Sequence, residues 1–72
     1  MTAVMGTTNP RERTVRSAAL LFREQGVEST GLRQVVEHAR APRGSLQHYF
    51  PGGKEQVVVE ALDWIAQKAA ER

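Results

Sequence analysis

The sequence predicts an all-α fold, with three short helices in one small domain followed by the first part of a fourth helix. In four segments the apolar residues recur at the three- and four-residue spacing of a helix face, not in the alternation of a strand. Prolines and glycines separate these segments and mark turns. The 72 residues include no cysteine, so neither a disulfide nor a thiolate metal site can stabilise the core, and helix packing has to do so alone.

The first helix is expected over residues 10–25. Asn9 suits the N-cap and Pro10 the first helical position, while Glu12 lies three residues after the cap, as in a capping box. Gly26 follows where a glycine in the left-handed conformation would end the helix. The apolar face consists of Val15, Ala18, Ala19 and Phe22, widened by Leu21.

The second helix is expected over residues 31–39, with Ser29 or Thr30 as its cap. Its apolar face consists of Leu32, Val35, Val36 and Ala39. Valines are β-branched and favour a strand, but the spacing of this face is helical and decides the prediction. Pro42 disfavours helical angles at the residue before it, so the helix is expected to end near Arg40.

The third helix is the shortest, over residues 43–50, because Pro42 precedes it and a Pro-Gly-Gly turn at residues 51–53 follows it. Leu46 and Phe50 are four residues apart and are expected to face the core. The side chains expected to point outward are Arg43, Gln47, His48 and Tyr49.

The fourth helix is expected over residues 54–72, with apolar residues on two neighbouring faces. One face carries Val58, Ala61, Leu62, Ile65 and Ala69, and the other carries Val57 and Trp64 beside Lys68. A three-helix domain can cover only one of these faces, and no capping glycine or proline follows. The helix is therefore expected to continue in a longer protein.

Positive charge is concentrated before the fourth helix. Residues 1–53 carry seven arginines against four glutamates, a net charge of +3, and residues 54–72 carry three cations against four acids, a net charge of −1. Between Glu37 and Glu55 there is no acid, but there are three cations and two histidines. This window favours a polyanionic partner, although a solvated cationic surface explains the charge equally well.

Catalysis, metal binding and membrane insertion are not expected. The sequence has no nucleophile–base pair and no phosphate-cradling loop, and His38 and His48 lie ten residues apart without carboxylates at ligand spacing. No cofactor is expected. No apolar run reaches the roughly 18–20 residues that span a bilayer, and the N-terminus lacks the features of a signal peptide, so a cytoplasmic protein is predicted.

Two consecutive helices joined by a short turn, the second short and rich in basic and polar groups, are typical of a small helix-turn-helix domain of the homeodomain-like kind. The major groove of DNA is about 12 Å wide and admits one helix, of which only the first turns meet base edges. A short reading helix is therefore sufficient. The alternative is a small helical module that binds another protein through the exposed face of the fourth helix.

Three sequence blocks resemble the DNA-binding domain of the TetR/AcrR family of transcriptional regulators. The first block consists of Val15, Ala18-Ala19, Leu21-Phe22 and Gly26, and the second of Thr30, Leu32 and Val35. The third consists of Ala39, Arg43-Gly44-Ser45-Leu46, Phe50, Lys54 and Glu55. The resemblance extends from residue 13 to about residue 62, and the additional glycine in FPGGKEQ is similar to the LmrA-like subgroup.

This resemblance implies a regulator, expected to be a repressor, that binds double-stranded DNA at a palindromic operator with its third helix in the major groove. Residues 1–8 would be a disordered tail, residues 9–53 the DNA-binding domain, and residues 54–72 the helix leading to an absent C-terminal domain. In the family that domain forms the homodimer and binds a small-molecule inducer. The implied core includes Phe22, Val35, Leu46, Phe50 and Leu62.

The resemblance implies that Arg33 and Arg43 face bases, since arginine suits the two acceptors of guanine. Ser45 and Gln47 would reach base edges or phosphates. Arg33 has an alternative role, because an ion pair with Glu37 one helical turn away is equally compatible with its position.

The other implied contacts hold the DNA backbone. His48, Tyr49 and Lys54 would bind phosphates, which sets the register without reading the sequence. Tyr49 has the alternative of packing against the first helix with its hydroxyl exposed. Thr30 would cap the second helix beside a phosphate, and Gly44 would permit close approach of the duplex.

Three positions depart from the family pattern. Arg40 stands in the turn where the family has glycine, and a left-handed arginine costs about 1 kcal/mol. Either the turn is rearranged, or the arginine is tolerated for a contact that it makes. Pro42 replaces the serine that caps the third helix, and Gln47 replaces a tyrosine.

Overall fold

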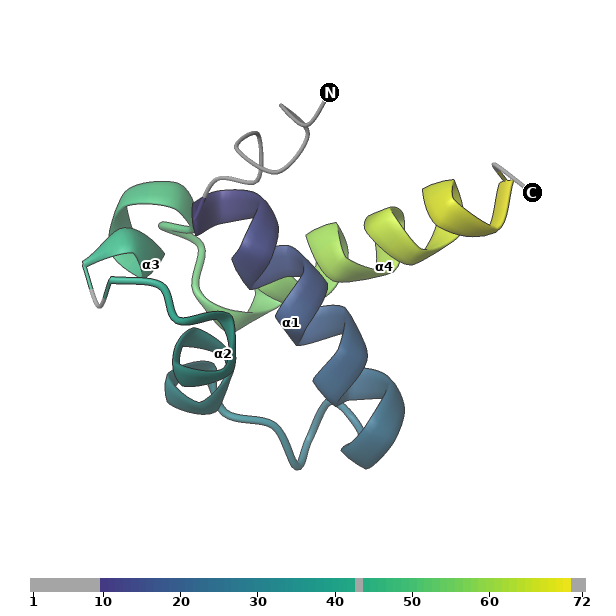
Figure 1. Ribbon diagram of the computed structural model, residues 1–72, viewed down its shortest axis with the longest axis horizontal. Helices are drawn as coiled ribbons and strands as arrows, with labels where there is room; N and C mark the ends of the chain where they lie inside the picture. Colours follow the sequence, from purple (N-terminus) through teal and green to yellow (C-terminus); the bar gives the residue numbers. More distant parts are fainter. Residues whose placement is uncertain (1–9, 43, 71–72) are drawn as a thin grey trace, which may run out of the picture.

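The computed structural model describes residues 10–42 and 44–70, which form four helices and no strand (Figure 1). The helices are α1 (Pro10–Gln25), α2 (Leu32–Ala39), α3 (Ser45–Tyr49) and α4 (Lys54–Ala70). The all-α prediction is confirmed, and the helix bounds agree with the predicted ranges within two residues. The predicted tail, the predicted cap Asn9, Arg43 and the last two residues lie outside the described part of the chain.

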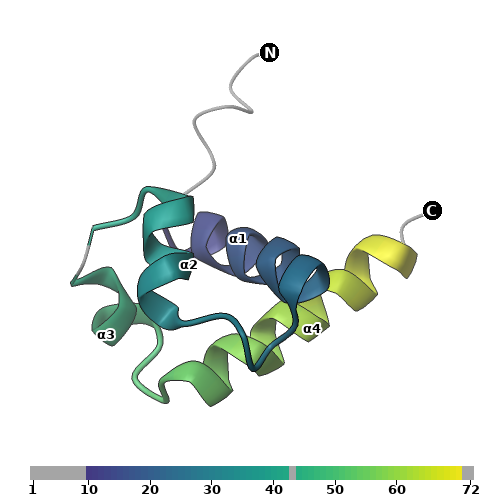
Figure 2. The same ribbon diagram turned by 90° about the horizontal axis from the view of Figure 1, so that it is seen from below.

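The first helix, α1, lies in the middle of the molecule and contacts each of the other three helices. Figures 1 and 2 show α2 and α3 together at one end, while α4 passes beside α1 and extends toward the opposite end. No helix in the described ranges combines the length and the apolar composition that crossing a bilayer requires. The arrangement leaves one side of α2 and α3 open to a partner.

The core lies between α1, α2 and α4. Its members are at most 8% exposed and are Val15, Ala18, Ala19, Leu21, Phe22, Val35, Phe50, Val57 and Ala61. The predicted apolar face of α1 is therefore confirmed, together with the predicted core positions Phe22, Val35 and Phe50. Leu46 of α3 is half buried and packs against this core.

One predicted core position on α4, Leu62, is wrong. Leu62, predicted to be in the core, is 55% exposed and Val59 is 64% exposed, whereas Val57 and Ala61 are 0% exposed. Trp64 is half buried and packs against the same core. The face that α4 turns toward α1 therefore combines residues from both predicted faces, spaced at i, i+4 and i+7. The small side chain of Ala61 allows the two helices to approach closely, and this orientation leaves Leu62 in solvent.

Gly26 ends α1 in the left-handed conformation, as its position predicts. Its φ is 91°, and its backbone N–H donates to the carbonyl of Phe22 at 2.9 Å. Glycine adopts this φ without the steric cost that a side chain would add, so the chain can turn sharply from α1 toward α2.

Candidate DNA-binding site

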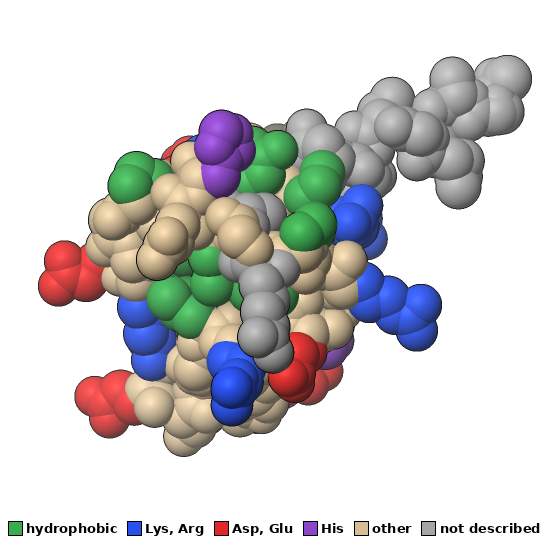
Figure 3. All heavy atoms as spheres, turned by 90° about the vertical axis from the view of Figure 1, so that its left-hand side faces the viewer, with side chains coloured by type: hydrophobic (Ala, Val, Ile, Leu, Met, Phe, Trp, Pro, Cys, Tyr) green, Lys and Arg blue, Asp and Glu red, His purple; other side chains and the backbone are tan. Residues whose placement is uncertain are grey.

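The helices α2 and α3, with the turn between them, form a helix-turn-helix at one end of the molecule. Figure 3 faces this end and shows Lys and Arg side chains on both flanks, a histidine at the upper edge and hydrophobic atoms between them. Acidic side chains lie toward the left-hand and lower edges of the same view. The cations at this end of the molecule favour a polyanionic partner.

The turn keeps a left-handed residue although that residue is Arg40. Its φ is 57° and its ψ is 39°, and it is the one non-glycine residue with positive φ in the described part of the chain. Its N–H donates to the carbonyl of Glu37 at 3.2 Å, and the N–H of Ala41 donates to the carbonyl of Val36 at 3.1 Å. The turn is therefore not rearranged, and the arginine adopts the conformation that costs about 1 kcal/mol.

Arg13 of α1 holds this turn from outside the helix-turn-helix. Its Nε donates to the carbonyl of Ala39 at 3.1 Å, and its Nη2 donates to the carbonyl of Arg40 at 3.4 Å. These carbonyls lie at the end of α2, where no further helical N–H is available to them. Arg13 was not a predicted site residue, because it binds backbone oxygens that no side-chain pattern reveals.

The beginning of α3 is open. Gly44, its N-cap, has φ −67° and ψ −14°, which any residue adopts, and an added Cβ would meet no atom within 4 Å. Neither the backbone nor the packing of this chain therefore requires glycine there. Ser45 is the first residue of α3. Arg43, which was predicted to contact a base, lies outside the residues that the structure describes.

Two predicted reading residues, Arg33 on α2 and Gln47 on α3, are exposed. The Arg33 side chain makes no ion pair or hydrogen bond with any residue in the described ranges, so the alternative ion pair with Glu37 is not formed. With Glu37, Arg40 and Leu46, Arg33 lines an open groove of about 470 Å³. The Arg33 guanidinium is thus available to a ligand of the helix-turn-helix.

The predicted phosphate-binding residues lie at the far end of α3 and at the start of α4. The exposed His48 ring meets the ring of Tyr49 edge to face, with centroids 4.7 Å apart and planes at 73°. Tyr49 is half buried and packs against the core. The packing of Tyr49, which was considered as the alternative to a phosphate contact, is therefore present. Lys54 is half buried, and its side chain forms no ion pair or hydrogen bond within residues 10–42 and 44–70.

The prediction that Thr30 or Ser29 caps α2 is wrong. The N-cap is Gly31 in an extended conformation, without a side-chain hydrogen bond. The Thr30 side chain is 1% exposed, and its hydroxyl donates to the carbonyl of Gly26 at 2.8 Å and accepts from Gln25 Nε2 at 3.1 Å. The hydroxyl is used inside the loop before α2, so it cannot also reach the helix terminus or a phosphate.

His38 is exposed, but its ring has a partner on another helix. Its Nδ1 lies 2.9 Å from the hydroxyl of Ser17, which joins α2 to α1. Within the described ranges, no three metal-ligating side chains come together. His38 thus links α2 to α1, whereas His48 lies exposed on α3.

Comparison with known proteins gives a consistent set of relatives. The chain is 52% identical over 61 residues to the uncharacterized HTH-type transcriptional regulator Rv0196 of Mycobacterium tuberculosis, an alignment that covers 85% of this chain and 31% of that protein. It is 45% identical over 65 residues to the HTH-type transcriptional regulator LmrA of Bacillus subtilis (85% and 35%) and 36% identical over 59 residues to the HTH-type transcriptional repressor KstR2 of Mycolicibacterium smegmatis (76% and 28%). The chain thus spans about a third of the length of these relatives.

No solved structure gives a significant match to the chain. A family model described as bacterial regulatory proteins, tetR family, matches residues 15–61, which include all nine core residues and the whole helix-turn-helix. The members of this family are transcription regulators and not enzymes, which agrees with the prediction that the chain has no catalytic activity. The matched residues and the fold agree, and the chain belongs to the tetR family of bacterial regulatory proteins.

Proposed function

We propose that this chain binds double-stranded DNA sequence-specifically, with α3 in the major groove. The observation that carries the proposal is the intact helix-turn-helix, in which a left-handed Arg40 preserves the turn and Arg33, Gln47 and His48 remain exposed. The names of the relatives, which are HTH-type transcriptional regulators, support the same function. The chain would then control transcription by occupying a DNA site.

The proposed base contacts come from both helices. Arg33 and Arg43 would donate to the O6 and N7 acceptors of guanine, the commonest specific arginine contact. Ser45 and Gln47 would reach neighbouring base edges or phosphates from the first turn of α3. The exposure of Arg33 and its lack of a partner in the described ranges support this assignment, because an arginine already paired would lose that partner on binding.

The proposed backbone contacts surround the reading helix. His48, Tyr49 and Lys54 would bind phosphates, and Gly44 would let the duplex approach the start of α3. The open space at Gly44 supports this role, since the fold gives no other reason for a glycine. Thr30 would act indirectly, by ordering the loop so that the free N–H groups at the start of α2 face a phosphate.

In a full-length regulator we expect a homodimer that places two such heads on a palindromic operator, in the cytoplasm. Two linked heads bind much more tightly than one, because the second contact becomes intramolecular. One relative is named a transcriptional repressor, which supports repression as the outcome. A small-molecule inducer would act through a C-terminal domain, which is the part of such proteins that α4 leads to in the family.

A second candidate function is binding of another protein through α4. It rests on Val59 and Leu62, which are 64% and 55% exposed on one side of that helix. Both functions are compatible in one molecule, because α4 and the helix-turn-helix are exposed on different parts of the surface.

The test is fluorescence anisotropy of a labelled short duplex of random sequence at increasing salt. We expect binding at low salt, with the logarithm of the association constant falling linearly with the logarithm of the salt concentration, by about 0.9 for each phosphate neutralised. Selection from a randomised duplex pool should then enrich one sequence. Absence of duplex binding at low salt would contradict the proposal and favour the protein-binding function of α4.

A further inference from the structure

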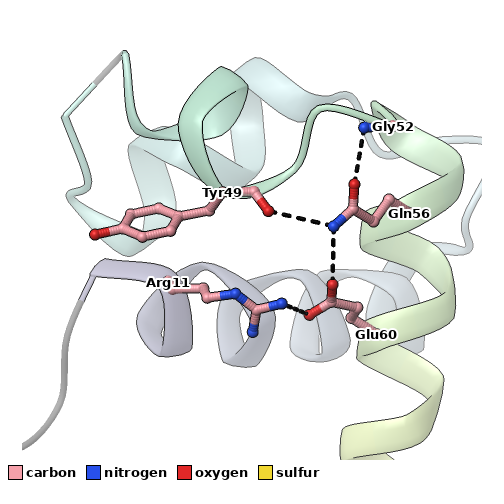
Figure 4. A network of polar contacts seen from close by, with 5 residues as sticks. All are labelled: Arg11, Tyr49, Gly52, Gln56 and Glu60. Atoms are coloured by element: carbon pink, nitrogen blue, oxygen red, sulfur yellow. Dashed lines mark hydrogen bonds and ion pairs between the residues drawn. The ribbon is translucent and has the colours of Figure 1, made fainter.

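A chain of side-chain contacts joins the end of α3 to α4 and α1 (Figure 4). The side-chain amide of Gln56 accepts from the N–H of Gly52 at 2.8 Å and donates from Nε2 to the carbonyl of Tyr49 at 3.2 Å. The same Nε2 donates to Glu60 Oε2 at 3.0 Å, and the other oxygen of Glu60 forms an ion pair with Arg11. We call these five residues the Gln56 network.

The Gln56 network contacts a helix that is too short to be stable on its own. The helix α3 has five residues, far fewer than an isolated helix needs to be stable in water. At its start, Gly44 has open space around it. At its end, Phe50 is buried in the core and the carbonyl of Tyr49 is bound by Gln56. Besides Leu46, which packs against the core, the contacts that hold α3 therefore lie at its C-terminal end.

The turn before α4 is shaped to admit Gln56. A Cβ added to Gly52 would lie 2.9 Å from Oε1 and 3.0 Å from Cβ of Gln56, so any side chain at this position would displace the Gln56 amide. Gly53, in contrast, has a φ of 76°, the left-handed region that favours glycine. The two adjacent glycines thus have separate physical reasons, and the reason for Gly52 is the space taken by Gln56.

On the other side, the network reaches α1 through Glu60 and Arg11. The guanidinium of Arg11 also lies 5.2 Å from the centroid of the Phe50 ring, directly after α3. Arg11 and Glu60 are 43% and 23% exposed, and an isolated ion pair at such exposure stabilises little. Their contribution is geometric, because they fix the carboxylate that orients the Gln56 amide.

We propose that Gln56, oriented by Glu60 and Arg11, is a positioning residue that sets the direction of the reading helix α3. The proposal rests on the proposed DNA-binding function. Base contacts require side chains placed within a few tenths of an ångström, whereas phosphate contacts tolerate displacement. Loss of the network should therefore lower discrimination between DNA sequences and leave sequence-independent affinity unchanged.

The experiment compares Gln56→Ala with Gln67→Ala, a matched control on the exposed part of the same helix whose side chain has no polar partner in the described ranges. Affinities are measured by anisotropy for the duplex that the wild-type chain selects from a random pool and for a scrambled duplex of equal composition. We expect Gln56→Ala to lower the ratio of the two affinities about tenfold, with the scrambled duplex bound as before. Gln67→Ala should keep the wild-type ratio.

Two further variants test the chain of contacts. Glu60→Ala should lower the ratio in the same direction, and the double variant Gln56→Ala/Glu60→Ala should lower it no further than Gln56→Ala alone, because both act through one link. Gly52→Ala should behave like Gln56→Ala, since its methyl group displaces the amide. Circular dichroism and thermal unfolding establish that each variant is folded before its ratio is compared.

A measurement without DNA tests the network directly. In Gln56→Ala the amide of Gly52 should exchange with solvent up to about tenfold faster than in the wild-type chain, while amides in the middle of α1 keep their rates. Unchanged exchange at Gly52, or a folded Gln56→Ala chain with the wild-type affinity ratio, would overturn the positioning role alone. A wild-type chain that binds neither duplex would instead overturn the proposed function.

Discussion

Arg40 occupies a conformation that glycine adopts at lower cost, and its side chain is exposed beside Arg33. We predict that Arg40→Gly is more stable to urea than Arg40→Ala by about 1 kcal/mol, because both remove the guanidinium but only glycine relieves the left-handed backbone. If the arginine is tolerated for a DNA contact, the two variants should weaken duplex binding equally. Equal urea midpoints for the two variants would show that the turn carries no such strain.

Gly44 is a glycine without a structural reason in this chain. We predict that Gly44→Ala leaves stability unchanged or raises it by about 0.4–1 kcal/mol, since alanine accepts φ −67° and restricts the unfolded chain. Its affinity for the selected duplex should nevertheless fall about tenfold, because the methyl group meets the DNA. Urea unfolding and anisotropy on the same samples check both parts. Unaltered affinity would remove Gly44 from the DNA surface.

At the scale of single residues, the sequence predicted which side chains are exposed better than it predicted their hydrogen-bond partners. Tyr49 was expected to point outward, but it is half buried and packs against the core. The exposure of Gln47 and His48 was correctly predicted from their positions around the helix. The roles of Thr30, Arg13 and Gln56 were not, because each side chain binds a backbone carbonyl. Which carbonyls lie unpaired and within reach depends on the folded turns, and no side-chain spacing encodes it.

At the scale of elements, helix bounds and most of the core were predictable. Prolines and glycines mark the ends of α1 and of the short α3, and a single apolar stripe on α1 leaves one way to pack it. The helix α4 lacks that property, since it carries two partly apolar faces. The face that packs contains Val57 and Ala61, both fully buried, and this choice between two apolar faces is a tertiary effect that periodicity alone does not specify.

The orientation of α4 has a direct consequence for stability. We predict that Val57→Ala lowers the free energy of unfolding by about 2 kcal/mol, because it leaves a cavity at a 0% exposed site. Leu62→Ala, on the side exposed to solvent, should change it by less than about 0.5 kcal/mol. Urea denaturation of the two variants checks this order. A larger loss from Leu62→Ala would mean that Leu62 is buried, as the resemblance implied.

At the scale of the whole molecule, the two parts of the chain before and after residue 53 differ in net charge and in the helices that they contain. The part up to residue 53 has a net charge of +3 and contains the helix-turn-helix, whereas the part from residue 54 has a net charge of −1 and consists mainly of α4. Figure 1 shows α4 leading away from α2 and α3. The Gln56 network is a polar link between the two parts, at the point where the reading helix meets the helix that leaves the domain.

In the proposed function, α3 reads the DNA sequence and the flanking residues bind the phosphate backbone of the DNA. One pair of variants separates these two roles. Affinities of Arg43→Ala and Lys54→Ala are measured for the selected duplex and its scrambled counterpart at several salt concentrations. Arg43→Ala should cost about 1–3 kcal/mol on the selected duplex alone and relax the preference at one base pair. Lys54→Ala should weaken both duplexes alike and reduce the salt slope by about one. Equal losses of affinity on both duplexes from Arg43→Ala would mean that Arg43 binds phosphate and does not read a base.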